Sequence, residues 1–309
     1  MITRPVKPLR LGTRASPLAV AQAHLVRAQL LAAHGWDAGL IEICPVVASG
    51  DKILDRALAE VGGKALWTKE LDQWLVNGDI DFSVHSMKDV ETHRPPEFII
   101  AAMLERADVR DRLIGAESVS ALPHGARVGT SAPRRHAQLL ARRPDLEICL
   151  FRGNVQTRLA KLAAGEAQAT LLAAAGLERL GMDDIGVAIA IEEMLPAPAQ
   201  GAIGIETLVS NHDMFVWLSA INHGATFACV NAERALLAGL SGDCRSPVAG
   251  LAVVRDTDIW LRCEIYSGDG QRKEIGEAMF ATDDEDAPAG LAARLLENAH
   301  PNVRESFGA

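Results

Sequence analysis

Two stretches of this sequence share one design, and they constrain the fold more than any other feature. Arg10-Leu-Gly-Thr-Arg-Ala-Ser-Pro17 and Arg127-Val-Gly-Thr-Ser-Ala-Pro-Arg-Arg135 each combine a strand-like start, a Gly-Thr pair, a hydroxyl and a proline, and a helical pattern follows. Serine caps the free backbone N–H groups of a helix, and proline suits its first position. We therefore predict two related α/β domains, each directing the anion-favouring N-terminus of a helix at a shared cleft.

The order of strands, helices and breaks predicts where the domains divide. The strand-like run Phe98–Met103 is followed by a charged segment, and Gln200–Glu206 resumes a strand after Pro196-Ala-Pro198. We expect the chain to cross to a second domain and back at these two points, which would form a hinge. The expected fold class is α/β, with a discontinuous first α/β domain (1–103 and 199–221), a second α/β domain (104–198) and a small C-terminal α+β domain (222–309).

Two segments of the first half have specific expected roles. Residues 105–112 alternate in charge, and we expect a solvated connection or surface ion pairs there. The segment Ala48–Glu70, with glycines before and after its charged residues, suggests a mobile flap. A P-loop is excluded at Lys64, because Val61-Gly-Gly-Lys-Ala lacks the upstream glycine and the Ser or Thr after the lysine.

The acidic composition excludes several classes of function. The 309 residues carry a formal net charge of −9, so bulk attraction to nucleic acid or to an anionic membrane is not expected. Apolar runs fall short of the roughly 20 residues of a membrane helix, and the first residues lack a signal-peptide core, so we expect a cytoplasmic protein. Five cysteines without CxxC spacing argue against a disulfide framework and a zinc site, and no metal is expected.

Arginines recur in this acidic chain where a strand gives way to a loop or helix. They are Arg14, Arg134, Arg135, Arg152, Arg158 and Arg179. Guanidinium groups suit bidentate contacts with carboxylate or phosphate. Any one of them could be a surface charge, but their repeated placement predicts a cleft for a ligand that carries many negative charges.

A cluster of ionisable and hydroxyl side chains ends the strand-like run that begins at Phe82. It reads His85-Ser-Met-Lys-Asp-Val90, and α/β sheets bind ligands at the loops that follow their strands. Asp89, among cations, is the candidate acid–base group, because a carboxylate can transfer protons and stabilise a developing positive charge. The simpler alternative is a solvated strand end.

The cysteines fall into two groups by their surroundings. Four lie in apolar or alternating segments and are expected to be buried thiols, namely Cys44, Cys149, Cys229 and Cys263. Cys244 lies instead in the polar turn Ser241-Gly-Asp-Cys-Arg-Ser-Pro247. There it could be a nucleophile, a covalent attachment point or only a thiol.

Together these motifs resemble one family over nearly the whole chain. The stretches that carry the resemblance include Arg10–Pro17, His85–Val90, Arg152-Gly-Asn-Val-Gln-Thr-Arg158, Gln200-Gly-Ala-Ile-Gly-Ile-Glu206 and the Cys244 loop. In this order they are similar to the porphobilinogen deaminases, also called hydroxymethylbilane synthases. The resemblance implies a cytoplasmic, monomeric transferase that condenses four porphobilinogen molecules, each losing ammonia, into the linear tetrapyrrole hydroxymethylbilane, a precursor of haem.

The resemblance also implies an architecture and a partner. It implies two α/β domains like those of periplasmic binding proteins and a small third domain that carries the cysteine loop. The product would be handed over to uroporphyrinogen-III synthase.

Each matched residue takes a role from the resemblance. Cys244 occupies the position where a dipyrromethane cofactor, built from substrate, is joined by a thioether. Asp89 resembles the catalytic aspartate that assists ammonia loss and stabilises the cationic pyrrole intermediate. The cofactor-binding positions match Lys88, Ser131, Arg134 and Arg135, and the substrate-binding positions match Arg14, Ser16, Arg152, Arg158 and Arg179.

The sequence departs from the family pattern beside these residues. Asp243 and Arg245 flank Cys244 where Gly and Gln are common, Ala132 removes a hydroxyl, and Ala199 stands where Gly is usual. A rival interpretation is a non-catalytic anion-binding protein of the same two-lobed fold. Cys244 and Asp89 separate the two, because a binding protein needs neither a covalent cofactor nor a carboxylate among its cations.

Overall fold

The structure, a computed structural model, describes residues 4–47 and 68–308, which fall into two units. The described residues of the first unit are 4–47, 68–107 and 201–227, and those of the second are 108–200 and 228–308. Helix α8 (Gly224–Gly239) begins in the first unit and continues in the second. Of the predicted flap Ala48–Glu70, residues 48–67 lie outside the described residues. The three-domain division, with boundaries after residues 103, 198 and 221, stays a prediction.

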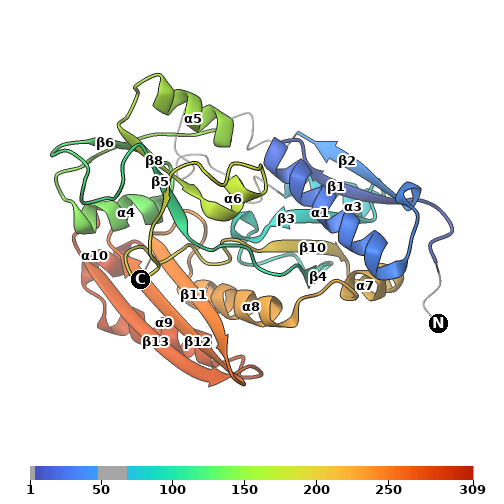
Figure 1. The fold of residues 1–309 in the computed structure, drawn as a ribbon. Helices are drawn as coiled ribbons and strands as arrows, with labels where there is room; N and C mark the ends of the chain where they lie inside the picture. Colours follow the sequence, from blue (N-terminus) through green and yellow to red (C-terminus); the bar gives the residue numbers. More distant parts are fainter. Residues whose placement is uncertain (1–3, 48–67, 309) are drawn as a thin grey trace. The chain divides into compact units, whose positions relative to one another are not determined.

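The first unit is built on a five-stranded sheet with the order β2-β1-β3-β10-β4 (Figure 1). Its strands are β1 (Leu9–Arg14), β2 (Ile41–Val46), β3 (Phe82–Ser86), β4 (Phe98–Met103) and β10 (Ile203–Leu208). The three strands β2, β1 and β3 run parallel, whereas β10 is antiparallel to both of its neighbours. The strand that starts after the proline-rich break thus completes a sheet formed by the N-terminal part of the chain.

Helices bury both faces of this sheet. They are α1 (Pro17–His34), α3 (Lys69–Asn77) and α7 (His212–Ser219), with short 3₁₀ turns η1 (Ala38–Leu40) and η3 (Met87–Asp89). Helix α1 starts as the sequence predicts, because the Ser16 hydroxyl accepts a hydrogen bond from the Ala19 N–H and Pro17 takes the first position. Helices α1 and α7 cover the face that carries Leu11 and Ile205, and α3 packs on the other face beside Ile80.

The second unit repeats this strand plan with a different part of the chain. Its sheet has the order β7-β6-β8-β5-β9, formed by β5 (Asp111–Ile114), β6 (Arg127–Gly129), β7 (Glu147–Cys149), β8 (Ala169–Ala173) and β9 (Val187–Ala188). Again the first three strands are parallel and the fourth is antiparallel to its neighbours. The helices of this region are α4 (Pro133–Arg142), α5 (Val155–Ala163) and α6 (Ala174–Glu178). The repeated motif of the sequence therefore reflects a repeated strand–helix unit, β1–α1 and β6–α4.

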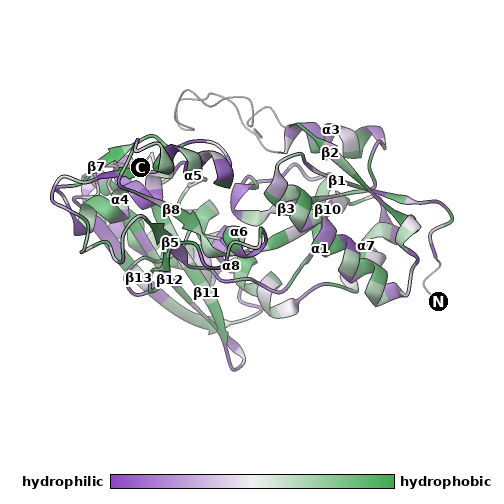
Figure 2. Ribbon diagram, turned by 45° about the horizontal axis from the view of Figure 1, so that its top comes forward, coloured by the Kyte–Doolittle hydropathy of each residue, from purple (hydrophilic) through white to green (hydrophobic). Residues whose placement is uncertain are grey.

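A third, antiparallel sheet completes the second unit. Its strands are β11 (Val248–Arg255), β12 (Asp258–Tyr266) and β13 (Lys273–Ala281), followed by α9 (Ala287–Asn298) and α10 (Pro301–Glu305). Residues of α8, α9 and α10 pack against one face of this sheet, around Leu236, Leu261 and Leu295. Figure 2 shows hydrophobic residues concentrated along β11. The predicted mixed α/β fold with a smaller C-terminal α+β part is confirmed, and β13 is a strand that the sequence reading did not predict.

The expected surface character of residues 105–112 is wrong at one position. Asp108 and Arg110 do form a partly exposed ion pair, with 2.7 Å between Oδ2 and Nη2. Asp111, however, begins β5 and has 0% of its surface exposed. The reason is that two arginines of α4 neutralise its carboxylate inside the protein, a partnership that alternating charge along the chain does not reveal.

The expectation for the cysteines holds in part. None of the five forms a disulfide; Cys229 and Cys263 are buried, and Cys244 is exposed. Cys44 and Cys149 are only half-buried, because each lies in a strand at an edge of its sheet.

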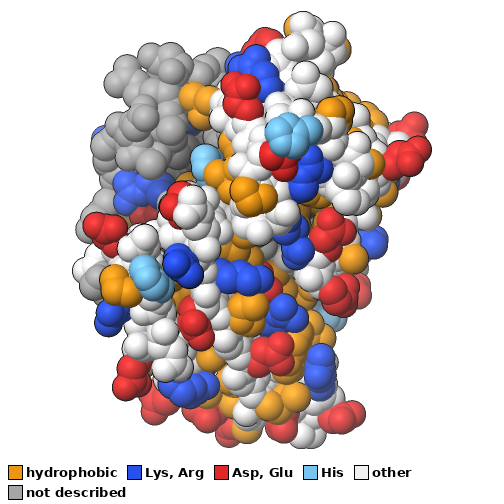
Figure 3. Space-filling model, turned by 90° about the vertical axis from the view of Figure 1, so that its left-hand side faces the viewer, with side chains coloured by type: hydrophobic (Ala, Val, Ile, Leu, Met, Phe, Trp, Pro, Cys, Tyr) orange, Lys and Arg blue, Asp and Glu red, His pale blue; other side chains and the backbone are white. Residues whose placement is uncertain are grey.

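The surface is mixed in charge. Figure 3 shows acidic and basic side chains interspersed over the face that it draws. In the described part of the chain, none of the helices has an apolar stretch long enough to cross a lipid bilayer.

Candidate functional site

The parallel strands of the first unit bring two predicted site residues together. Arg14 is the last residue of β1, and Asp89 follows β3, its parallel neighbour. Because parallel strands end at the same edge of a sheet, the two side chains meet there, with 3.9 Å between Arg14 Nη1 and Asp89 Oδ2. The side chain of Asp89 is 37% exposed and that of Arg14 is 20% exposed, so both can be reached by a ligand.

The short turn that carries Lys88 and Asp89 is anchored on both sides. Met87 and Val90 are buried, and the Val90 N–H donates to the Met87 carbonyl at 3.2 Å. A side chain on Gly204 of β10 would lie 2.0 Å from the Met87 sulfur, so glycine at this position lets Met87 pack directly on β10. The buried flanks leave Lys88 and Asp89 as the partly exposed residues of the turn.

Ser16 and Gln22 contribute from α1 to the same edge. The Ser16 hydroxyl caps α1, so part of its hydrogen-bonding capacity is already used by the Ala19 N–H at 3.4 Å. Gln22 bonds Ser86 through both ends of its amide, at 2.8 and 3.1 Å. These bonds tie the start of α1 to the end of β3.

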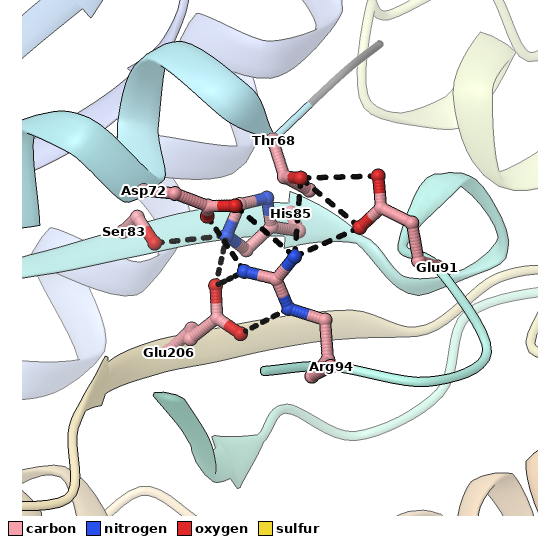
Figure 4. A network of polar contacts seen from close by, with 7 residues as sticks. All are labelled: Thr68, Asp72, Ser83, His85, Glu91, Arg94 and Glu206. Carbon is pink, nitrogen blue, oxygen red and sulfur yellow. Dashed lines mark hydrogen bonds and ion pairs between the residues drawn. The ribbon is translucent and has the colours of Figure 1, made fainter. Parts of the chain in front are cut away.

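A network of polar side chains joins α3, β3 and β10 to the segment that follows Asp89 (Figure 4). Its members are Thr68, Asp72, Ser83, His85, Glu91, Arg94 and Glu206. Arg94 is the centre, because it contacts Asp72 at 2.6 Å, Glu91 at 2.8 Å and Glu206 at 2.8 Å. His85 Nε2 also contacts Glu206, at 3.1 Å. The network therefore fixes the segment after Asp89 to α3 and to β10.

Burial and charge shift the pKa values of this network in opposite directions. Burial raises the pKa of Asp72 above its ordinary value. Burial also disfavours ionised Glu206, but His85 and Arg94 outweigh it and hold the pKa of Glu206 below its usual range. Glu206 is thus an ionised carboxylate with 0% exposure, held by the Arg94 guanidinium and by a hydrogen bond with His85.

In the second unit, the predicted arginines follow three parallel strands. Ser131, Arg134 and Arg135 come after β6, Arg152 and Arg158 come after β7, and Arg179 comes after β8 and α6. Because β6 pairs in parallel with both β7 and β8, these residues follow strand ends at one edge of the sheet. The clustering expected from the sequence thus has a basis in the topology.

Arg134 and Arg135 are buried and share one carboxylate. Arg134 Nη1 lies 2.8 Å from Asp111 Oδ2, and Arg135 Nη2 lies 2.7 Å from Asp111 Oδ1. Gln200 donates to the same carboxylate at 2.9 Å. Burial opposes ionised Asp111, but the two arginines outweigh it and hold the pKa of Asp111 well below its usual range.

Two donors of this cluster lack a partner. Arg134 Nε and Arg135 Nε are buried, and neither has a hydrogen-bond acceptor among the described residues. An unmatched buried donor is costly, so these N–H groups favour an acceptor from a ligand. One Asp111 charge against two guanidinium charges also leaves the cluster cationic, which suits a ligand that carries carboxylates.

The other arginines of this edge differ in their surroundings. Arg152 is buried, at 5% exposure, and Arg158 lies on α5, where its Nε donates to the Gly153 carbonyl at 3.0 Å. Asn154 caps that helix by accepting from the Thr157 N–H at 2.9 Å. Burial lowers the pKa of Arg179 to about 10, which still leaves its guanidinium charged at neutral pH.

Cys244 lies in a turn between α8 and β11 that is closed by its own polar side chains. Asp243 Oδ1 accepts from the Arg245 N–H at 2.8 Å, and Asp243 Oδ2 accepts from Arg245 Nε at 2.9 Å. The Ser246 hydroxyl accepts from the Asp243 N–H at 3.1 Å. The two charges that depart from the family pattern therefore neutralise each other beside an exposed thiol.

Sequence reasoning missed the residues that hold the arginines in place. Asp111, Gln138 and Gln200 contact Arg134, Arg135 or their shared carboxylate, and all three are at most 1% exposed. Asp111 in β5 and Gln138 in α4 share one signal, polarity at a position that strand or helix periodicity assigns to the interior, whereas Gln200 lies in a turn before β10. That signal is weak in a single sequence, because an isolated polar residue is also consistent with a surface position.

Fold and site together define a class: an α/β protein whose two mixed sheets each carry arginines at the ends of parallel strands, with Asp89 beside the arginine of one sheet and an exposed thiol in the turn before β11. Residues 9–215 match the family described as porphobilinogen deaminase, dipyromethane cofactor binding domain, and residues 227–298 match its C-terminal domain. The chain belongs to the porphobilinogen deaminase family.

Individual relatives agree with this assignment. The porphobilinogen deaminase of Sphingopyxis alaskensis is 57% identical over 99% of this chain and 98% of its own length. The chloroplastic porphobilinogen deaminase of Pisum sativum is 48% identical over 85% of this chain and 73% of its own length. A periplasmic substrate-binding protein from Coxiella burnetii gives a TM-score of 0.41 at 12% identity, covering 73% of this chain and 96% of its own, which is too low to support an argument.

The family assignment gives the activity. The chain is a transferase with hydroxymethylbilane synthase activity, and the matched N-terminal region is a dipyrromethane cofactor-binding domain. The rival interpretation as a non-catalytic anion-binding protein is not favoured.

Proposed function

We propose that Asp89 is the acid–base group of the condensation and that Cys244 is the attachment point of the dipyrromethane cofactor. The observation that carries the first assignment is the pairing of Asp89 with Arg14 at the strand ends of one sheet, 3.9 Å apart. A carboxylate in that position is both accessible and next to a cation.

Asp89 has the properties that ammonia loss requires. At 3.9 Å the contact with Arg14 is an ion pair rather than a short hydrogen bond, so the carboxylate oxygens keep capacity to accept from a substrate N–H. The charged carboxylate offsets the positive charge that develops on porphobilinogen as its amine leaves as ammonia. A proton can pass between Asp89 and the leaving amine at the same place.

The residues of the second unit suit the cofactor. When bound, the dipyrromethane group supplies the pyrrole carbon to which the first new unit is added. Arg134 and Arg135 would hold its carboxylates through their unpartnered Nε–H groups, and Ser131, in the turn before α4, would add a hydroxyl donor. Lys88 would contribute a further cation from the first unit.

The remaining cations suit the acetate and propionate groups of porphobilinogen and of the growing chain. Arg14, Arg152, Arg158 and Arg179 supply guanidinium groups, and Ser16 supplies a hydroxyl at the start of α1. Two carboxylates enter with each added unit, so a series of arginines at successive strand ends gives them successive partners.

The cellular setting is a further part of the proposal. We place the enzyme in the cytoplasm as a monomer that hands its product to uroporphyrinogen-III synthase. The acidic chain is expected to bind neither nucleic acid nor membrane. The plant relative is named chloroplastic, so the compartment differs among relatives.

Intact-mass spectrometry on three proteins tests both assignments. The wild type is expected to carry an added mass of two linked pyrrole units, whereas Cys244→Ser is expected to carry none. Asp89→Asn is expected to keep the adduct and to lose roughly 10²–10⁴-fold in turnover, since this is what a positioned acid–base group contributes. Turnover would be measured as the rate of hydroxymethylbilane formation at saturating porphobilinogen.

Two outcomes would contradict the proposal. A bare wild-type polypeptide after incubation with porphobilinogen would remove Cys244 from its role. Near-normal turnover of Asp89→Asn would remove Asp89 from the mechanism, whatever the state of the adduct.

A further inference from the structure

The turn that carries Asp89 is held at two points, one before the aspartate and one after it. Before it, Met87 is 1% exposed, and its N–H donates to the carbonyl of the residue before β10 at 3.1 Å. After it, the Glu91 side chain reaches Arg94 and Thr68, as Figure 4 shows. Asp89 lies midway between the two points, and both belong to the first unit.

The second of these points is a closed set of hydrogen bonds. Arg94 Nη1 donates to Glu91 Oε2 at 2.8 Å and to the Thr68 hydroxyl at 3.1 Å. The Thr68 hydroxyl in turn donates to Glu91 Oε2 at 3.0 Å. Thr68 is 1% exposed and the side chain of Arg94 is 9% exposed, so both partners lie in the interior. The partly exposed Glu91 side chain is therefore held by two buried groups.

The contact of Asp89 with Arg14 is too long to fix the carboxylate by itself. At 3.9 Å it is an ion pair without the directionality of a short hydrogen bond, and 37% of the Asp89 side chain is exposed. The place of this carboxylate is therefore set mainly by the backbone that carries it. That backbone is anchored through Met87 on one side and through Glu91 on the other.

Arg94 can lose Glu91 without becoming an unpaired buried charge. Asp72 lies 2.6 Å from Arg94 Nη2 and Glu206 lies 2.8 Å from Arg94 Nε, so two carboxylates remain. The large cost of breaking a buried pair arises when one charge is left uncompensated, which is not the case here. A variant at Glu91 is thus expected to fold and to keep the rest of the network.

We infer that Glu91, held by Arg94 and Thr68, is a positioning residue that sets the place of Asp89 in the reaction. This inference rests on the proposed function, in which Asp89 is the acid–base group. Such a group must lie within hydrogen-bond reach of the proton that it transfers, and a displacement of about 1 Å can cost on the order of 10²-fold in rate. Loss of the Glu91 anchor displaces the turn but leaves the arginines of the strand ends in place. The condensation then slows without a matching loss of affinity for porphobilinogen.

The test separates kcat from KM. Glu91→Ala removes the carboxylate, and we expect kcat to fall about ten-fold while KM for porphobilinogen stays within about two-fold of wild type. The rate of hydroxymethylbilane formation is divided by the fraction of molecules that carry two linked pyrrole units, measured by intact mass, so that misfolded protein does not enter it. Glu91→Gln keeps an oxygen that accepts from Arg94 and Thr68, and it should restore kcat to within about three-fold of wild type.

The matched control is Asp72→Ala, which removes a carboxylate from the same guanidinium but on α3 rather than on the turn. It is expected to lower the melting temperature about as much as Glu91→Ala and to keep the wild-type kcat. Thr68→Val removes the second partner of Glu91. Within the described residues the Thr68 hydroxyl does not cap α3, so the start of that helix is unaffected. We expect kcat of Thr68→Val to fall about three-fold, the effect of one lost net hydrogen bond.

Each outcome decides the inference. A wild-type kcat in Glu91→Ala would overturn it, as would an equal fall of kcat in Asp72→Ala or a Glu91→Gln variant as slow as Glu91→Ala. If Glu91→Ala did not fold, Thr68→Val would decide by the same comparison of kcat with KM. Near-normal turnover of Asp89→Asn would instead overturn the proposed function, so the two failures are distinguishable.

Discussion

At the scale of single residues, Ala199 has a backbone conformation that a side chain disfavours. It has a φ of 61°, in the left-handed region that residues other than glycine avoid. It is buried, and its N–H donates to the Glu233 carboxylate, which also accepts from Ala252 at 2.7 Å. These bonds to a buried carboxylate hold Ala199 in a conformation that costs roughly 1–2 kcal/mol.

Ala199→Gly is therefore expected to stabilise the protein. The left-handed strain disappears, and the greater freedom of glycine in the unfolded chain offsets part of the gain, so we expect a net increase of about 0.5–1 kcal/mol in the free energy of unfolding. Urea denaturation measures it. The matched control is Ala202→Gly, an equally buried alanine without positive φ, which should lose about 0.5–1 kcal/mol. A loss of similar size in both variants would mean that Ala199 is not strained.

At the scale of elements, Arg94 joins three parts of the first unit. It contacts Asp72 on α3, Glu206 on β10 and Glu91 in the segment after the Asp89 turn, and its side chain is only 9% exposed. The guanidinium also lies 4.9 Å from the ring centroid of Phe98 on β4. The position of the Asp89 turn thus depends on one buried cation surrounded by carboxylates.

Arg94→Met keeps most of the side-chain volume and removes the charge. Among the contacts of Figure 4, Glu206 then keeps only the one with His85. We expect a loss of about 3–5 kcal/mol, as for other buried pairs from which one partner is removed. The control is Arg4→Met, which breaks the exposed ion pair of Arg4 with Asp37 in the same unit and should cost at most about 1 kcal/mol. Similar losses in the two variants, measured by thermal unfolding, would contradict a structural role for the network.

At the scale of the whole molecule, each unit contains an ionised carboxylate that is fully buried. Asp111 in the second unit and Glu206 in the first are both 0% exposed, and both have pKa values held below the ordinary 3.8 and 4.5 by cations that outweigh burial. A carboxylate with a lowered folded-state pKa contributes stability that is present above its ordinary pKa and lost as pH falls towards the folded value. Burial raises the pKa of Asp72, so its contribution to stability grows as pH falls and offsets part of this loss.

We therefore expect the melting temperature to fall steeply below about pH 4. Asp111→Asn should lower the melting temperature at pH 7. It should also make the fall of the melting temperature at acid pH less steep, because the amide has no charge to lose. Asp37→Asn, at an exposed position, should leave the curve unchanged. If the melting temperature of Asp111→Asn fell at acid pH as steeply as that of the wild type, Asp111 would not be the source of this pH dependence.

The sequence by itself determined the local features of this protein. Alternating strand and helix patterns, the Ser16-Pro17 helix start and the repeated Gly-Thr motif depend on neighbouring residues, and they predicted β1–α1, β6–α4 and the mixed α/β class. The motifs around Asp89 and Cys244 identified the family because each is contiguous in the chain.

Only the tertiary structure decided which charges are partners. Asp111 meets Arg134 and Arg135 because β5 pairs with β8 in the sheet whose strand β6 leads into α4. Arg94 meets Glu206 across more than a hundred residues of chain. Such contacts depend on strand order and on which faces pack together. They arise only after the chain has folded, and no local pattern of polar residues distinguishes a buried pair from two surface charges.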